Sequence, residues 1–175
     1  MDTTPTSSDA LITYRPFGKT IPTSGAFFDG SYRYLLWRIW DAQLPRVLWI
    51  LLNPSIADAS QNDPTLRRLI GFSRSFGFGS LEVVNLFALC SSTPDALRGV
   101  IDAVGPDNDR YIQEALARTP TIIAAWGNRG TLANREQTVL SLIRKPISCL
   151  GTTFSGHPKH PLYVSASTPL CLYST

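Results

Sequence analysis

The sequence predicts an α/β fold: a three-layer α/β/α sandwich around a central, mostly parallel sheet of four to five strands. Short apolar runs begin near residues 47, 81, 121 and 147. Runs without a polar interruption are typical of strands that are covered on both faces. The intervals between them contain helical patterns and have the lengths that βαβ units need, which favours parallel pairing with helices on both faces.

The first predicted strand precedes these runs. Residues 32–40 alternate large apolar with polar side chains, a pattern that indicates an antiparallel or edge strand. Residues 47–52 are all apolar and predict the first core strand, which stops at Asn53-Pro54. The remaining core strands are predicted over 81–84, 121–126 and 147–150.

Helical patterns lie between the core strands. Asp63 supplies an N-cap and Pro64 a first-turn proline for a helix that ends near Gly77. A second helix opens at residues 106–109, and its inward side chains are predicted to be Ile112, Ala115 and Leu116. A third helix runs through residues 132–143.

The chain of 175 residues has the length of one domain, and 43% of its residues are hydrophobic, which is enough for a core without metals or disulfides. Residues 1–30 are rich in Thr, Ser, Pro and Gly and predict a partly ordered tail on a single α/β domain of residues 31–175. Three cysteines, each in an apolar stretch, predict buried thiols without a thiol pair. They are Cys90, Cys149 and Cys171.

Composition excludes several classes of protein. No apolar stretch approaches about 20 residues, so we expect no membrane partner and a soluble, cytoplasmic protein. The formal net charge of +3 permits a nucleic-acid or phosphate partner without demonstrating one. The GxxxxGK[ST], GxGxxG and GxSxG motifs are absent from the sequence. We therefore expect no cofactor, and no oligomeric state is predicted.

Polar residues follow every predicted core strand. In parallel sheets, ligands bind outside the carboxyl ends of the strands. An asparagine at the end of a strand can be a turn-former, and a histidine in a loop can be packed or solvated. Several such residues at one edge of the sheet together predict a binding site. The segments that converge are Asn53-Pro54-Ser55, Asn85-Leu86-Phe87, Gly127-Asn128-Arg129 and residues 151–162, which contain both His157 and His160.

Other polar residues near this edge have a functional and a structural interpretation. His157 and His160 have no cysteine beside them, so no metal site is expected. Asp58 lies in the loop after Asn53 and is a candidate for substrate binding. Basic side chains that could contact a phosphate, with a solvated face as the alternative, are Arg67, Arg68, Arg129 and Lys159.

These motifs in combination resemble the DUF1643 family of uncharacterised bacterial proteins, over about residues 32–173. That resemblance implies no activity. The motifs that carry it are residues 52–58 with 63–68, Val84-Asn85-Leu86-Phe87-Ala88, residues 105–109, Ala125-Trp126-Gly127 and His160-Pro161-Leu162-Tyr163.

The order of the motifs is also similar to that of the uracil-DNA glycosylase superfamily. The resemblance implies that Asn53 positions the attacking water, that Asn85 reads the edge of a base, and that His157 or His160 stabilises the oxyanion. It also implies a wedge role for Leu162 in a DNA complex. Phe87 or Trp126 would stack on the base, with core packing the alternative for Trp126.

Two functions from different classes are therefore expected. The first is an enzyme that takes a nucleobase, in DNA or in a small nucleotide, into the crevice and cleaves its N-glycosidic bond. The second is a binding module that holds a nucleobase-containing ligand at the same residues without chemistry. A third reading is a fold that only mediates an interaction through a dimer contact at this edge. The absence of a carboxylate beside Pro54 favours the second.

Overall fold

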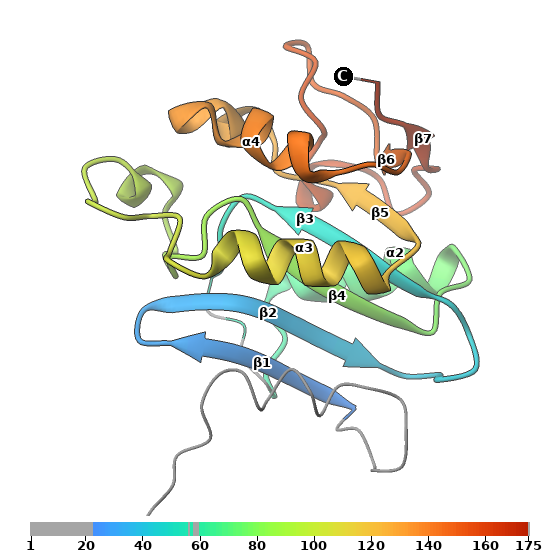
Figure 1. The fold of residues 1–175 in the computed structure, drawn as a ribbon. Coiled ribbons are helices and arrows are strands. Elements are labelled where there is room, and N and C mark those ends of the chain that lie inside the picture. Colours follow the sequence, from blue (N-terminus) through green and yellow to red (C-terminus); the bar gives the residue numbers. More distant parts are fainter. Residues whose placement is uncertain (1–22, 56, 58–59, 175) are drawn as a thin grey trace, which may run out of the picture.

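One mixed sheet organises the computed structural model, which describes residues 23–55, 57 and 60–174. Within these residues, seven strands are ordered β1-β2-β4-β3-β5-β6-β7 (Figure 1). In chain order they are β1 (Ser24–Asp29), β2 (Tyr32–Ile39), β3 (Arg46–Leu51), β4 (Ser80–Asn85), β5 (Thr121–Ala124), β6 (Ile147–Cys149) and β7 (Cys171–Leu172).

The centre of the sheet is parallel, as expected. β3 pairs in parallel with β4 on one side and β5 on the other, and β5 pairs in parallel with β6. The carboxyl ends of these four strands therefore meet at one edge of the sheet. The uninterrupted apolar run of β3 fits this position, because Val47, Leu48, Trp49 and Ile50 are completely buried.

The sheet is larger than the predicted four to five strands, because β1 and β7, which were not predicted, extend it to seven. β1 pairs with β2, β2 pairs with β4, and β7 pairs with β6. β2 is antiparallel as expected, but β1 covers its outer side, so β2 is not an edge strand. β1 at Ser24–Asp29 also lies inside residues 1–30, which were expected to form a tail. Residues 1–22 of that segment lie outside the described residues.

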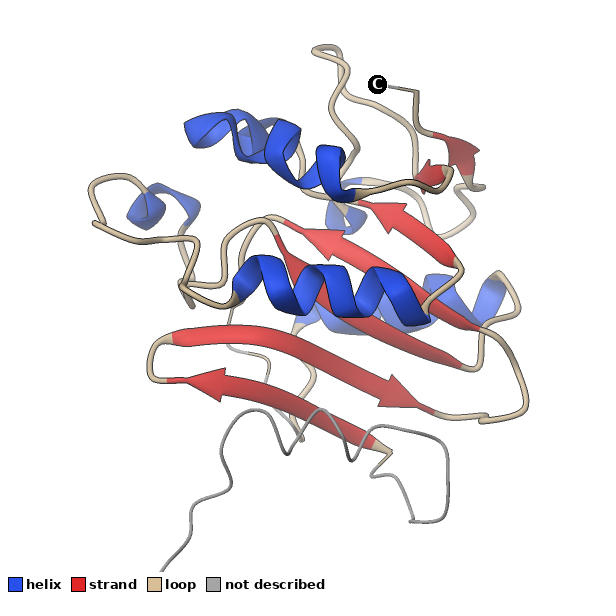
Figure 2. Cartoon of the chain, viewed as in Figure 1, coloured by secondary structure: helices blue, strands red, loops and turns tan. Residues whose placement is uncertain are grey.

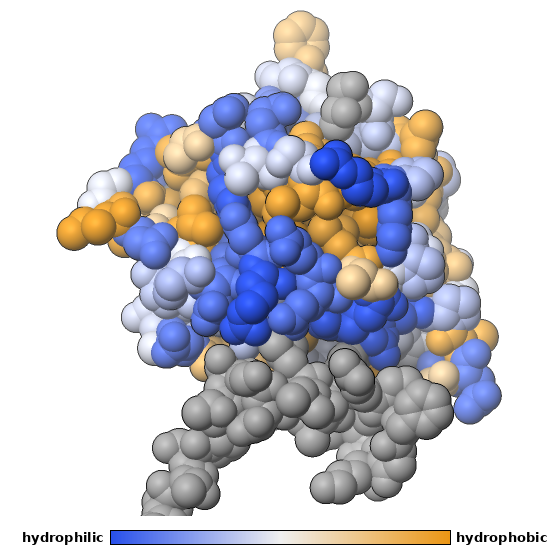
Figure 3. Space-filling view, in the orientation of Figure 1, coloured by the Kyte–Doolittle hydropathy of each residue, from blue (hydrophilic) through white to orange (hydrophobic). Residues whose placement is uncertain are grey.

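Helices lie on both faces of the sheet (Figure 2). α3 (Asn108–Arg118) and α4 (Arg135–Leu142) contribute to one buried cluster, and α2 (Pro64–Ser75) contributes to another on the opposite face. Figure 3 shows the α3 face, where a hydrophobic area is framed by hydrophilic side chains. No helix among the described residues has the length and apolar character needed to cross a membrane.

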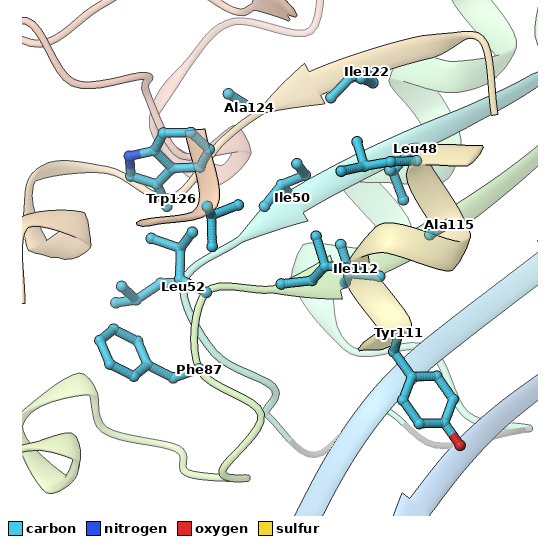
Figure 4. Packing of buried hydrophobic residues seen from close by; sticks show 14 of the residues in the cluster. Leu48, Ile50, Leu52, Phe87, Tyr111, Ile112, Ala115, Ile122, Ala124 and Trp126 are labelled. Carbon is cyan, nitrogen blue, oxygen red and sulfur yellow. The ribbon is translucent and has the colours of Figure 1, made fainter. Parts of the chain in front are cut away.

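Side chains of β3 pack against side chains of α3 on one face of the sheet. Leu48 and Ile50 lie opposite Ile112 and Ala115 of α3, and Trp126 lies toward the carboxyl end of the strands (Figure 4). Ile112 and Ala115 are fully buried, as the helical pattern predicts. Burial of such side chains is the dominant favourable term in folding.

α2 begins as its sequence predicts. The Asp63 carboxylate accepts a hydrogen bond from the Leu66 backbone N–H at 2.7 Å, and Pro64 occupies the first turn. This cap satisfies one of the backbone donors that a helix start leaves unpaired. The buried Trp49 indole N–H donates to Ser73 Oγ at 3.0 Å, which attaches α2 to β3. The start of α2 is thus held near the carboxyl edge of the sheet.

The cysteines depart from the expectation of three buried, separate thiols. Only Cys149 is buried; Cys90 is half-buried and Cys171 is exposed. Cys149 and Cys171 lie opposite each other on β6 and β7, with their sulfur atoms 3.5 Å apart. The expectation was wrong because β7 has only two residues, and its pairing with β6 cannot be read from a local pattern.

Glu82 of β4 allows the contribution of a buried ion-pair cluster to stability to be tested. Its fully buried carboxylate lies 2.9 Å from guanidinium nitrogens of both Arg46 and Arg118, whose side chains are 25% exposed. We expect Glu82→Gln to lower the free energy of unfolding by about 3 kcal/mol, because the substitution removes the buried charge that both ion pairs share. Urea unfolding followed by circular dichroism measures this change.

The matched control is Glu114→Gln. Glu114 pairs with Arg110 at 3.2 Å, but their side chains are 35% and 40% exposed. An exposed pair of this kind contributes about 0.5 kcal/mol. Equal losses in the two variants would contradict the structural role of Glu82.

Candidate functional site

A cavity of about 640 Å³ lies at the carboxyl edge of the sheet, between the ends of the parallel strands and the start of α2. We call it the carboxyl-edge cavity. Its apolar side chains come from β2, β3, β4 and α2, and include Leu36, Leu51, Val83, Leu66 and Leu69. A size of this order and an apolar lining with few polar groups are typical of small-molecule sites.

Eight of the sixteen predicted site residues line the carboxyl-edge cavity. They are Asn53, Ser55, Trp126, Gly127, Asn128, Arg129, Lys159 and His160. Seven others do not line it: Pro54, Asn85, Phe87, Arg67, Arg68, His157 and Leu162. Asp58 lies outside the described residues.

Asn53 presents a fixed oxygen acceptor. Its side-chain Nδ2 donates to the backbone carbonyls of Pro54 at 3.0 Å and Ser91 at 2.9 Å. Both amide hydrogens are therefore used, which determines the orientation of the group. Oδ1 has no hydrogen-bond donor among the residues that the structure describes. Asn53 can therefore accept a hydrogen bond from a ligand or from a water molecule.

A carboxylate also lines the carboxyl-edge cavity. Asp63 caps α2 with Oδ1, and its Oδ2 is hydrogen-bonded by the Ser55 hydroxyl. Asp63 was predicted only as a helix cap. The cap and the cavity coincide because α2 begins at the edge where the parallel strands end. The site thus contains a negative charge that the motif around Asn53 lacks.

His160 is the histidine that lines the carboxyl-edge cavity. Its Nδ1 accepts from the Leu162 backbone N–H at 3.3 Å, so the neutral ring carries its proton on Nε2. Burial lowers the pKa of His160, and the nearby Asp63 carboxylate partly opposes that effect. His160 is therefore neutral at pH 7, with Nε2–H free of any acceptor in the described part of the chain.

His157 has a different role, although both histidines were candidates. Its Nδ1 lies 3.0 Å from Oε2 of Glu136, a buried residue of α4. The same oxygen accepts from the Trp126 indole N–H at 3.0 Å. Glu136 therefore joins the loop of His157 to the Trp126 side chain. His157 supports the wall of the carboxyl-edge cavity from behind and does not line it.

Gly130 sets the position of Trp126. A Cβ atom at Gly130 would lie 2.3 Å from Cδ1 and 2.7 Å from Nε1 of the indole. It would also lie 3.0 Å from Oε2 of Glu136. Any side chain here would force the indole or the carboxylate to move, so glycine is required for this close approach.

The four predicted basic residues divide into two pairs. Arg129 and Lys159 line the carboxyl-edge cavity. Arg129 forms an ion pair with Asp95, whose pKa this contact lowers. The Lys159 ammonium has no hydrogen-bond or ion-pair partner within the described residues. Lys159 is therefore the cation of this cavity that remains available for a ligand.

Arg67 and Arg68 act elsewhere in the fold. Arg67 donates to the backbone carbonyl of Asn62 at 2.6 Å. Arg68 donates to the carbonyls of Pro161 and Val164, and so ties α2 to the 3₁₀ helix η3 (Pro161–Tyr163). Neither guanidinium lines the carboxyl-edge cavity, so their predicted phosphate contacts have no support from its geometry.

Three other predicted residues lie in the core or on the surface. Phe87 is 2% exposed, packs in the cluster on the α3 face and does not line the carboxyl-edge cavity, so it offers no ring face there for stacking. Pro54 is buried, and its backbone carbonyl accepts from the Ser91 N–H at 2.9 Å. Leu162 is 43% exposed, beside Tyr163, which lines the rim.

Asn85 is buried without a side-chain partner. Both polar atoms of its amide lack a hydrogen bond to the described residues, although the side chain is almost inaccessible. Asn85 pairs with Leu51 of β3 and follows Val83 by two positions on β4. Because alternate residues share a face, its side chain belongs to the face whose Leu51 and Val83 line the cavity. It therefore lies next to the cavity wall.

Sequence reasoning missed several lining residues. Arg33 reaches from β2 and donates to the backbone carbonyl of Ala57, although a strand arginine carries no local signal of such a contact. Ser91 and Ser92 follow β4 after a long loop. Tyr163 belongs to the recognised motif His160-Pro161-Leu162-Tyr163 but was not proposed as a site residue, and its place in the motif with His160 was the available signal.

Comparisons with known proteins identify a family. The family model described as "Protein of unknown function (DUF1643)" matches residues 33–162. No curated protein and no solved structure matches the chain. None of these comparisons supports the resemblance to the uracil-DNA glycosylase superfamily.

The pKa of His160 is testable by nuclear magnetic resonance. The chain has two histidines, so a His157→Gln variant leaves one imidazole to titrate. We expect its pKa to lie below the ordinary 6.5, because burial disfavours the charged ring. The unfolded chain then takes up this proton first, so the free energy of unfolding falls as the pH drops below about 6.5.

Asp63→Asn is the matched second variant for this titration. Asparagine retains the helix cap but removes the negative charge that raises the pKa of His160. The pKa should therefore fall further in the His157→Gln, Asp63→Asn double variant. A pKa at or above 6.5, unchanged by Asp63→Asn, would contradict the described environment of His160.

Proposed function

Since the chain belongs to the DUF1643 family, whose description gives no activity, we propose a function from the carboxyl-edge cavity. We infer that it recognises a nucleobase-bearing ligand and hydrolyses the N-glycosidic bond of that ligand. One observation carries the proposal: a fixed acceptor, Asn53 Oδ1, and a neutral donor, His160 Nε2–H, line the same largely apolar cavity of about 640 Å³.

Recognition of a base requires flat apolar walls and directed polar groups. The leucine side chains and the Trp126 indole supply the walls. Asn53 Oδ1 accepts a hydrogen bond from a ring N–H, or from a water molecule that lies beside the sugar. His160 Nε2–H donates to a carbonyl oxygen of the base, where negative charge develops when the base departs.

Hydrolysis then uses the Ser55 hydroxyl and the Asp63 carboxylate. A water oxygen forms a bond to the anomeric carbon while the carbon–nitrogen bond breaks. The electron pair of the carbon–nitrogen bond leaves with the base. The proton released by the water passes through the Ser55 hydroxyl to the Asp63 carboxylate, whose charge also favours a cationic sugar in the transition state. The proton later returns to the departed base, so the products are the free base and the sugar.

The charges favour a small nucleotide over duplex DNA. Among the four basic residues expected at the rim, Arg67 and Arg68 bind backbone carbonyls elsewhere, and Arg129 is paired with Asp95. Lys159 is left for a phosphate. Proteins that bind duplex DNA neutralise several phosphates at once, which one available lysine does not do. The wedge role of Leu162 stays a prediction for the DNA case.

Binding without bond cleavage is the second candidate. Asp63 favours it, because both of its oxygens already accept hydrogen bonds, from the Leu66 N–H and the Ser55 hydroxyl. Neither oxygen is then left without a hydrogen bond to receive the proton of an attacking water molecule. In this case the same residues hold the base and Asp63 is only structural.

Calorimetry against free bases, nucleosides and nucleoside phosphates tests recognition. We expect Asn53→Ala and His160→Gln each to weaken binding about tenfold, the effect of one lost hydrogen bond in a buried site. Lys159→Gln should weaken the binding of phosphorylated ligands more than that of nucleosides. Gln113→Ala, an exposed amide on α3, and Arg67→Gln should leave affinity unchanged. Equal effects in the control variants, or no binding at all, would contradict recognition.

Product analysis by chromatography separates the two candidates. Release of a free base from a bound nucleotide, or from oligonucleotides with uracil, mismatched or modified bases, supports hydrolysis. Asp63→Asn should then lower the rate at least 100-fold while affinity changes little. Binding with no release of base by the wild type would support the second candidate, and excision from duplex DNA alone would contradict the preference for a small nucleotide.

A further inference from the structure

The C-terminal strand brings two cysteines together on neighbouring strands, and neither of them lines the carboxyl-edge cavity. Cys149 of β6 and Cys171 of β7 are register partners in an antiparallel pair. Their sulfur atoms lie 3.5 Å apart. Facing residues of antiparallel strands have Cα atoms about 4.5–5.5 Å apart, which falls within the range that a disulfide spans. The backbone is thus arranged for a disulfide without rearrangement.

We propose that Cys149 and Cys171 are a reversible redox site, oxidised to a disulfide by small-molecule disulfides of the glutathione class. The two thiols differ in access, since Cys171 is exposed and Cys149 is completely buried. Cys171 therefore reacts with the oxidant, and Cys149 completes the disulfide. Cys90, the third cysteine, lies between β4 and η1 (Pro94–Leu97) and takes no part.

Two exchange steps form the disulfide. The Cys171 thiolate attacks one sulfur of the oxidised disulfide, breaks its S–S bond and releases the first thiol. Cys149 then loses its proton, attacks the Cys171 sulfur and expels the second thiol. Two protein thiols are oxidised, and one small disulfide is reduced to two thiols. Burial raises the pKa of Cys149 to about 11, which keeps this thiol protonated until Cys171 has reacted.

Oxidation would anchor a strand that has few other attachments. β7 consists of two residues, and the next residue, Tyr173, donates its backbone N–H to Ile147 at 2.8 Å. The Tyr173 ring packs edge-on against Trp126, with centroids 5.9 Å apart. Trp126 lines the carboxyl-edge cavity. The disulfide therefore holds in place the strand whose tyrosine supports one wall of that cavity.

Thiol counting on the full chain tests the proposal. In a Cys90→Ser variant, incubation with oxidised glutathione should reduce the free thiols, counted after denaturation, from two to none. The intact mass should fall by the two hydrogens lost, without a glutathione adduct, and peptide mapping should link Cys149 to Cys171. Dithiothreitol should restore both thiols.

Two variants separate the roles of the cysteines. Cys149→Ser in the Cys90→Ser background should stop at a glutathione adduct on Cys171, whereas Cys171→Ser should keep Cys149 as a free thiol. Oxidation should raise the melting temperature of the Cys90→Ser protein by roughly 5–10 °C, because the disulfide closes a loop of about 20 residues. Two free thiols after oxidation, or a stable adduct on Cys171 with Cys149 present, would overturn the proposal.

Discussion

The parallel pairing of β3 with both β4 and β5 is the constraint on which the site depends. It brings the carboxyl ends of neighbouring strands to one edge, so that the loops after them converge. Parallel strands need crossover connections, and α2 and α3 supply these from opposite faces of the sheet. The start of α2 then brings Asp63 to the same edge. Chain direction alone thus gathers residues that are far apart in the sequence.

Elements with a strong local pattern were predictable. The unbroken apolar run predicts β3, and Asp63-Pro64 predicts the start of α2. β1 and β7 were missed for different physical reasons. β1 is an outer strand with exposed and half-buried residues, in which Gly25 leaves room for the Trp37 ring. β7 is too short for any periodicity, and only its pairing with β6 makes it a strand.

The lining of the carboxyl-edge cavity was predictable where the chain leaves a core strand. Asn53 and the segment from Gly127 to Arg129 were found in this way, because strand ends in parallel sheets determine where ligands bind. The two histidines could not be separated from sequence, since they are three residues apart in one loop. A turn at Gly156, with φ of +84°, and the Thr152–Pro158 bridge direct His157 toward Glu136 and leave His160 at the cavity. Arg33 arrives from a strand with no polar motif at its end.

Gly130 gives this site an unusual dependence on a residue outside it. Gly130 does not line the carboxyl-edge cavity, yet the space that it leaves open is what lets the Trp126 indole lie back against Glu136. An alanine at position 130 would place its methyl carbon 2.3 Å from the indole and 3.0 Å from Glu136 Oε2, so the indole or the carboxylate would have to move. One methyl group at a position outside the carboxyl-edge cavity can therefore disturb the hydrogen bond that holds a side chain of its wall, while every lining residue stays the same.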